Sequence, residues 1–126
     1  MTHHTIFFTK THEWILPSEG KVGISNYAQG RLGDIVYIEL TAQGKEVKKG
    51  DVIAVIESVK TTSDIYAPCD GKVLELNQEV TSNPGLINQD PEGAGWIIKI
   101  EVKEPFSSEG LMSKEEYETY IKTLSE

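Results

Sequence analysis

A lysine is the first of the few residues in this sequence whose type and surroundings suggest chemistry. Lys60 stands between two short apolar stretches, Val52–Ile56 and Ile65–Ala67, which predict two strands joined by a turn. A lysine on such a turn is exposed, but a free ammonium group is a poor nucleophile at neutral pH. Taken alone, the pattern indicates an ordinary solvated lysine, so the neighbouring residues must decide whether Lys60 is an attachment point.

The second candidate is the single cysteine, Cys69. A thiol beside a histidine can act as a nucleophilic pair, and three histidines lie near the N-terminus: His3, His4 and His12. Cys69 follows a proline and precedes the turn residues Asp70-Gly71, which favours a structural thiol. No cysteine lies near the histidines to complete a zinc site, so a solvated segment is favoured over a metal site there. The sequence contains neither a Gly-x-Ser-x-Gly elbow nor a Walker A loop.

Composition narrows the classes of partner. The 126 residues include 12 basic and 20 acidic ones, which gives a net charge of −8. Nucleic acid and anionic membranes would repel such a chain, and no apolar run approaches the roughly 18 residues that span a bilayer. The length predicts one domain, residues 1–126, that can bury a core without disulfides.

The N-terminal residues predict a location. They show neither the basic and apolar segments of a signal peptide nor the Arg- and Ser-rich composition of a transit peptide. One cysteine also excludes an internal disulfide. These features predict a bacterial cytoplasmic protein, although an organellar protein whose transit peptide had been removed would look similar.

Turn residues divide most of the chain into short stretches rich in Val, Ile and Tyr. The clearest are Asp34–Leu40, Val52–Ile56, Asp64–Ala67, Lys72–Leu76 and Trp96–Val102. Many short strands at regular turn spacing indicate a sandwich or barrel. The expected fold is therefore mainly β. The most loop-like segment is Asn83–Gly95, and a loop of that size is often functional.

The C-terminal residues change from strand to helix pattern. Ser113 and Glu116 have the spacing of a capping box. Apolar side chains then recur at helical spacing, at Tyr117, Tyr120, Ile121 and Leu124. This predicts an amphipathic helix over residues 113–125 that lies on the β core. A second short helix is expected near Ser25–Gly30.

The residues around Lys60 resemble the modified hairpin of lipoyl and biotinyl carrier domains. Biotin carriers usually have methionine on both sides of the lysine, and this chain has Val59 and Thr61. Lipoyl domains of the 2-oxoacid dehydrogenases usually have an acidic residue directly before the lysine. The segments Glu57–Lys60 and Ser63–Pro68 resemble instead the H-protein family of the glycine cleavage system.

The resemblance to the H-protein family extends over most of the chain. Further matching segments, in the family's order, are Thr11–Trp14, Gly33–Leu40, Asn83–Asn88, Gly95-Trp96 and Leu111–Tyr120. The resemblance implies a barrel-sandwich hybrid of the lipoyl/biotinyl type. Two small sheets would occupy residues 12–103, followed by the C-terminal helix.

The resemblance also implies a function for Lys60. Its side-chain amine would be joined to lipoate by an amide, and the protein would be a carrier rather than an enzyme. The arm would take the aminomethyl group from a glycine decarboxylase (P protein) to an aminomethyltransferase (T protein), and electrons to dihydrolipoamide dehydrogenase (L protein). Glu57 and Gly71 match positions that lipoate-attaching enzymes read. The expected oligomeric state is a monomer.

An aminomethyl group on the arm is cationic, so acidic side chains near Lys60 would hold the loaded arm against the protein between visits to the enzymes. The candidates are Glu13, Asp64 and Asp70.

Three alternative functions remain compatible with the same sequence. A relay protein would hold octanoyl or lipoyl groups on Lys60 for transfer to other complexes. An interaction module would leave Lys60 unmodified. A stand-alone enzyme would use Cys69 as its nucleophile, and Cys69→Ala would abolish its turnover.

Overall fold

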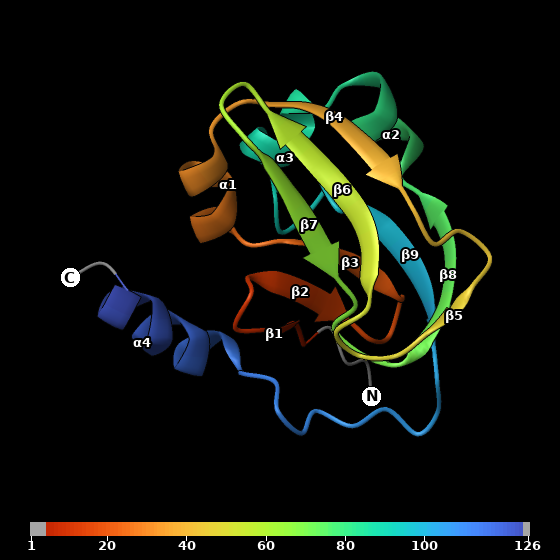
Figure 1. The fold of residues 1–126 in the computed structure, drawn as a ribbon. Coiled ribbons are helices and arrows are strands. Elements are labelled where there is room, and N and C mark those ends of the chain that lie inside the picture. The colour runs from red at the N-terminus through yellow and green to blue at the C-terminus, as the bar shows by residue number, and fades with distance from the viewer. Residues whose placement is uncertain (1–4, 125–126) are drawn as a thin grey trace.

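The computed structural model describes residues 5–124, so His3 and His4 lie outside it. Its strands form two antiparallel sheets that face each other (Figure 1). The larger sheet has the spatial order β1 (Phe7–Phe8), β2 (Glu13–Leu16), β3 (Lys21–Ile24), β9 (Ile98–Val102), β8 (Gly71–Leu76) and β5 (Glu46–Val47). The smaller sheet has the order β4 (Ile35–Leu40), β6 (Val52–Ser58) and β7 (Thr62–Tyr66). The prediction of a mainly β fold with two sheets is confirmed.

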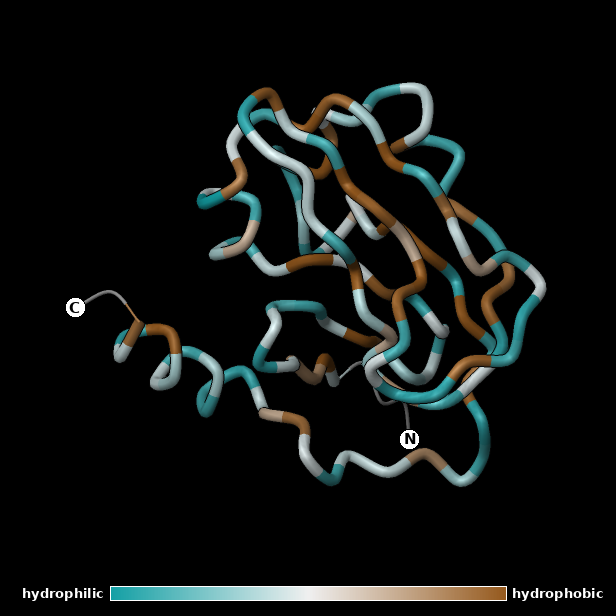
Figure 2. Tube along the Cα trace, viewed as in Figure 1, coloured by the Kyte–Doolittle hydropathy of each residue, from teal (hydrophilic) through white to brown (hydrophobic). Residues whose placement is uncertain are grey.

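The main hydrophobic core lies between the sheets, and hydrophobic residues recur along the strands of both (Figure 2). The inward-facing side chains include Val22, Val73, Ile98 and Ile100 of the larger sheet and Ile38, Ile56 and Ile65 of the smaller one. Each of these side chains is at most 6% exposed. Burying a Val or Ile side chain stabilises a fold by about 1.5–3 kcal/mol, so this layer fixes the two sheets against each other.

The predicted strands are present, with shifted ends. β7 begins two residues before the predicted Asp64, because Thr62 and Ser63 pair with Glu57 and Ile56 of β6. Strands β1, β2, β3 and β5 were not among the predicted stretches. They are two to four residues long, too short for alternating hydrophobicity to stand out.

Within residues 5–124 the sheets are accompanied by the helices α1 (Asn26–Leu32), α2 (Gln78–Ser82), α3 (Gly85–Gln89) and α4 (Lys114–Leu124). α1 confirms the helix expected near Ser25, whose hydroxyl caps it by accepting a hydrogen bond from the Ala28 N–H at 3.1 Å. None of the helices within residues 5–124 is long and apolar enough to cross a membrane.

The expectation of a loop over Asn83–Gly95 is wrong in part, because α3 lies within it. The Asn83 carbonyl accepts a hydrogen bond from the Leu86 N–H at 3.0 Å and starts the turn. Ile87 is fully buried in the main core. Burial of one side chain therefore overrides the loop-forming composition of the segment.

The capping box at the start of α4 is confirmed. The Ser113 N–H donates to Glu116 Oε1 at 2.8 Å, and the Glu116 N–H donates to Ser113 Oγ at 3.2 Å. α4 packs on a second, smaller core in which the rings of Phe8 and Tyr117 stack with centroids 4.4 Å apart. Residue 125, the predicted end of the helix, lies outside the described residues.

Candidate functional site

The turn that joins β6 to β7 presents Lys60. The Ser58 N–H donates to the Thr61 carbonyl at 2.8 Å, so Val59 and Lys60 form a two-residue loop. The buried Ser58 hydroxyl accepts hydrogen bonds from the N–H groups of Lys60 and Thr61, at 3.3 and 3.1 Å. The Val59 N–H donates to the Asp34 carbonyl at 2.9 Å. Hydrogen bonds to Ser58 and Asp34 therefore fix the backbone of the turn, and the side chains of Val59 and Lys60 face solvent.

Asn88 of α3 supports the segment beneath this turn. Its Oδ1 accepts a hydrogen bond from the Ile35 N–H at 2.9 Å. Its Nδ2 donates to the Gly33 carbonyl and to Gln29 Oε1, both at 2.9 Å. One amide side chain thus joins the start of β4 to the C-terminal end of α1. Sequence reasoning noted Asn88 only as part of a family-like segment and missed this role.

The Lys60 side chain is exposed and extends over the C-terminal cap of α1. A Cβ built on Gly33, whose φ is 83°, would lie 3.7 Å from Lys60 Cε. No hydrogen bond or ion pair involves Lys60 Nζ among residues 5–124. The exposure of the side chain leaves its amine accessible to an enzyme that would acylate it.

Glu57 and Gly71, the two predicted recognition residues, lie in different surroundings. Glu57 is exposed on β6, three residues from Lys60, and pairs with Thr62. Gly71 starts β8, beyond the far end of β7 from the turn (Figure 1). A Cβ at Gly71 would collide with the carbonyl oxygen of Glu101 on β9. Close approach of two strands therefore requires glycine there, whatever an external enzyme reads.

A cleft of about 410 Å³ lies between α1 and β7. Lys60 does not line it but stands near one end of each wall, two residues before β7 and over the C-terminal cap of α1. α1 contributes Ala28 and Leu32 to one wall, β7 contributes Asp64 and Ile65 to the other, and Glu13 lies where they meet. The structure thus brings together two of the three acids proposed to hold a cationic arm.

Glu13 is 2% exposed, and both oxygens of its carboxylate accept hydrogen bonds. Oε1 accepts hydrogen bonds from the hydroxyls of Thr9 and Thr11, and Oε2 accepts one from the Tyr66 N–H at 3.0 Å. Burial raises the pKa of Glu13, while these hydrogen bonds oppose the rise. A carboxylate at the edge of a low-dielectric cleft attracts a cation more strongly than one in bulk water.

The expectation that His12 belongs to a solvated segment is wrong. His12 is half-buried, lines the cleft, and places Nδ1 2.7 Å from the hydroxyl oxygen of Tyr117 on α4. The same hydroxyl oxygen is 2.6 Å from Ser25 Oγ. Burial, followed by the charge of Arg31, lowers the pKa of His12. The polar contact between His12 and Tyr117 spans 105 residues, so no local pattern could have indicated it.

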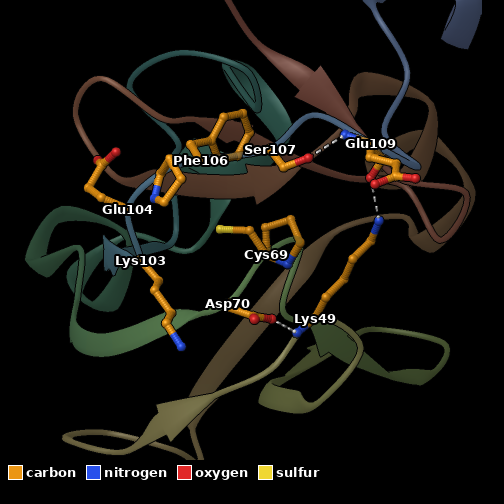
Figure 3. Close-up of a pocket in the computed structure, with 10 residues that line it drawn as sticks. Lys49, Cys69, Asp70, Lys103, Glu104, Phe106, Ser107 and Glu109 are labelled. Atoms are coloured by element: carbon orange, nitrogen blue, oxygen red, sulfur yellow. Dashed lines mark hydrogen bonds between the residues drawn. The ribbon is translucent and has the colours of Figure 1, made fainter.

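Cys69 and Asp70 lie in a separate pocket of about 330 Å³ that also contains Lys49 and Lys103 (Figure 3). Burial raises the pKa of the Cys69 thiol to about 11, with a further rise from Asp70 opposed by Lys49. The thiol is thus protonated at neutral pH and is a poor nucleophile. Asp70 Oδ1 accepts a hydrogen bond from the Lys49 N–H at 2.9 Å, so it does not face the cleft beside Lys60.

No group of three or more His, Cys, Asp or Glu side chains within residues 5–124 is arranged to hold a metal ion.

Two antiparallel sheets that present a lysine on a tight hairpin turn have the architecture of carrier domains of the lipoyl/biotinyl type. The family model for the glycine cleavage H-protein matches residues 6–124. The chain belongs to that family, whose members are non-catalytic carrier components of a multienzyme system.

Individual relatives agree with this assignment. The chain is 48% identical over 122 residues to glycine cleavage system H protein 4 of Aquifex aeolicus, covering 95% of this chain and 71% of the relative. It is 47% identical over 115 residues to the H protein of Thermotoga maritima, with 90% and 93% of the two chains covered. The crystal structure of an H protein from Mycobacterium marinum superposes with a TM-score of 0.82 at 31% identity, covering 97% and 99% of the chains.

Proposed function

We propose that this protein is the lipoyl-carrying shuttle of a glycine cleavage system, with lipoate joined to Lys60 by an amide. The observation that supports this most directly is the exposed Lys60 amine on a turn whose backbone is held by Ser58 and Asp34. When bound, lipoate supplies a disulfide that accepts the aminomethyl group and passes on electrons. The half-apolar cleft beside Lys60 fits such an arm.

Glu57 and Gly71 are proposed as residues that lipoate-attaching enzymes read. The exposed carboxylate of Glu57, three residues before Lys60, supports its role. An in vitro lipoylation assay on Glu57→Gln tests this, with Glu39→Gln as a matched exposed control on β4. A fall in kcat/KM for Glu57→Gln alone supports direct recognition. For Gly71 the strand contact with β9 makes loss of folding the expected result of Gly71→Ala, so its assay needs a parallel unfolding measurement.

Asp64 and Glu13 are proposed to hold the cationic cargo of the arm in the cleft. Asp64 is exposed on β7 and Glu13 is buried beside it, so the two present negative charge at different depths. NMR measurement of arm mobility in Asp64→Asn and Glu13→Gln tests this, with Asp70→Asn as the control in the other pocket. Increased mobility in the first two alone is expected. Unchanged mobility in both would refute the docking role.

The proposed partners are glycine decarboxylase (P protein), aminomethyltransferase (T protein), dihydrolipoamide dehydrogenase (L protein) and the lipoate-attaching enzymes. Cross-strand pairing places two rows on the outer face of the smaller sheet, Tyr37–Glu57–Thr62 and Glu39–Val55–Asp64. Neither row contains a basic residue, and acylation would also remove the charge of Lys60. An acidic face of this kind supports attraction to basic partner surfaces, which weakens with salt.

The proposed working form is a monomer in the bacterial cytoplasm, which sedimentation of the purified protein and fractionation of its host would check. The intact mass of protein from its own host is the decisive test of function. A lipoyl-sized increment on Lys60, absent from Lys60→Arg, is expected. An octanoyl increment would favour the relay function, and no increment in cells that lipoylate other proteins would refute the carrier.

A further inference from the structure

The cleft between α1 and β7 has two walls that are held in place differently. α1 packs less tightly on the rest of the protein than β7 does. None of the seven residues of α1 is fully buried, and its apolar contact with the main core comes from two partly buried side chains, Ala28 and Leu32. Ile65 in the opposite wall is 1% exposed. A helix that buries so little apolar surface gains less from the hydrophobic effect than the strand opposite it, so polar contacts at its ends contribute to its position.

The C-terminal end of α1 is held by Asn88, through Gln29 and Gly33. The N-terminal end is held by a hydrogen bond from the Asn26 N–H to Glu92 Oε2 at 2.9 Å and by a series of polar contacts that leads to Tyr117. The Ala28 N–H donates to Ser25 Oγ at 3.1 Å, and Ser25 Oγ lies 2.6 Å from the Tyr117 hydroxyl. Tyr117 belongs to α4, which reaches this position after the segment 103–113 has crossed beneath the sheets (Figure 1).

The Tyr117 hydroxyl is held between Ser25, the N-terminal cap of α1, and His12, which lines the cleft. Its ring stacks on Phe8 with an interplanar angle of 6°, and the same hydroxyl contacts His12 Nδ1 at 2.7 Å. His12 has a φ of 78°, and no other non-glycine residue within 5–124 has a positive φ. A bulky residue held in the left-handed region indicates that surrounding contacts fix it there.

One arrangement of protons gives every donor and acceptor in this series of hydrogen bonds a partner. A neutral His12 accepts the Tyr117 proton at Nδ1, the Tyr117 oxygen accepts the Ser25 proton, and the Ser25 oxygen accepts the Ala28 N–H. Without the Tyr117 hydroxyl, the Nδ1 of His12 loses its donor and the Ser25 hydroxyl loses its acceptor. One oxygen atom therefore joins the cleft, α4 and the N-terminal cap of α1.

We propose that Tyr117 is a positioning residue that holds α1 at the distance from β7 required for the docked lipoyl arm. The inference rests on the proposed carrier function, because it concerns the cleft that the arm would occupy. Tyr117 contacts neither Lys60 nor the turn that presents it. Loss of its hydroxyl therefore loosens the cleft and leaves attachment of lipoate to Lys60 intact.

The test compares Tyr117→Phe with Tyr120→Phe, which removes the same atom from the same helix. The Tyr120 hydroxyl donates to the Lys10 carbonyl at 3.4 Å and does not contact α1. For Tyr117→Phe in the lipoylated, aminomethyl-loaded protein, we expect arm mobility by NMR to increase and the cargo to be lost about three- to tenfold faster, the effect of one hydrogen bond. Tyr120→Phe should stay within about twofold of the parent.

Hydrogen exchange on the unmodified protein gives a readout that does not depend on loading. In Tyr117→Phe the Ala28 and Gln29 amides should exchange faster, and the Val59 amide in the hairpin should be unchanged. Ser25→Ala breaks the same link from the α1 side and should reproduce the arm phenotype if Tyr117→Phe fails to fold.

The outcomes separate this inference from the carrier function. Full lipoylation of both variants with unchanged arm mobility and cargo loss would overturn the positioning role and leave the carrier function standing. An absence of lipoylation in the parent protein would instead refute the carrier function, and the positioning role with it. Equal effects of Tyr117→Phe and Tyr120→Phe would indicate general loosening of α4 and overturn the role assigned to the Tyr117 hydroxyl.

Discussion

The hairpin that presents Lys60 and the helix α1 that faces it differ in what holds them. The hairpin belongs to a sheet whose inner side chains, including Ile56 and Ile65, are 1% exposed. α1 has no fully buried residue and packs against the core only through the partly buried Ala28 and Leu32. Its ends are held by hydrogen bonds that involve Tyr117, Glu92 and Asn88. Burial therefore places the attachment point, and polar contacts place the opposite wall of the cleft.

Because the two regions are held differently, changes in the hairpin should mainly affect stability, and changes at the ends of α1 should mainly affect docking of the arm. Apolar burial contributes most of the free energy of folding and is non-directional, so damage to the hairpin sheet should appear as loss of stability. Hydrogen bonds contribute less net free energy but are directional. Damage at the ends of α1 should therefore change the cleft more than it changes unfolding. An element held in this way can open locally without unfolding the domain.

The largest expected contrast compares one apolar residue from each wall. Ile65→Ala removes a side chain that is 1% exposed and should lower the free energy of unfolding by about 2–5 kcal/mol. Leu32→Ala on α1 removes a half-buried side chain and should lower it by about 1 kcal/mol or less. Urea unfolding measures both. Equal losses would mean that burial anchors both walls and would break the comparison.

The next effect concerns Asn88, which touches both regions. Asn88→Ala removes all three hydrogen bonds and should destabilise the protein by about 1–3 kcal/mol. Asn88→Asp keeps an acceptor for the Ile35 N–H but loses the donors to Gly33 and Gln29. Hydrogen exchange should show the Ile35 amide protected in Asn88→Asp and unprotected in Asn88→Ala. Loss of that protection in both variants would show that the contact of Asn88 with β4 depends on its contacts with α1.

The sequence allowed prediction of the features that depend on neighbouring residues. The Lys60 hairpin followed from two β-rich stretches around a polar turn, and α4 followed from the capping box at Ser113. Both signals are local, because a turn and a helix cap are each formed by a few consecutive residues. Family resemblance then supplied what those patterns lacked, the identity of the group that Lys60 would carry.

The features that escaped prediction depend on contacts between distant segments. Tyr117 was recognised as an apolar residue of α4, and its ring does pack on Phe8, but its hydroxyl acts on Ser25, 92 residues away. Asn88 was taken as part of a loop, although the burial of Ile87 folds that segment into a helix. Gly71 is a further example. In the sequence it looks like an ordinary turn glycine, but a Cβ there would collide with the carbonyl oxygen of Glu101.

A smaller effect is expected at the turn itself. Ser58→Ala removes the hydroxyl that accepts hydrogen bonds from the N–H groups of Lys60 and Thr61, and should destabilise the protein by about 1 kcal/mol. The rate of lipoylation should also fall, because the Lys60 backbone becomes less ordered. Ser63→Ala is the control, since its hydroxyl makes only a 3.5 Å contact with the Asp64 carbonyl. An unchanged lipoylation rate in Ser58→Ala would show that order at the turn is not limiting.

The smallest effect is a dependence on pH at Glu13, where the two regions meet. Burial raises the pKa of Glu13 above its ordinary value of 4.5. A carboxyl group whose pKa is higher in the folded state favours folding most when it is protonated. Its contribution is therefore complete below about pH 4.5 and declines as the pH rises through the folded-state pKa. The free energy of unfolding, relative to the non-titrating Glu13→Gln, should thus rise between pH 7 and pH 4.

Urea unfolding of both proteins across this pH range measures the difference, because the other titrating groups are common to both and cancel. A difference that instead grew with pH would mean that the hydrogen bonds from Thr9, Thr11 and Tyr66 outweigh burial. The same measurement on the loaded carrier sharpens the argument. A cationic cargo docked beside Glu13 favours the charged carboxylate and lowers its pKa, so the pH dependence should become weaker. If loading leaves it unchanged, the cargo does not reach Glu13, and Asp64 alone would face the amine.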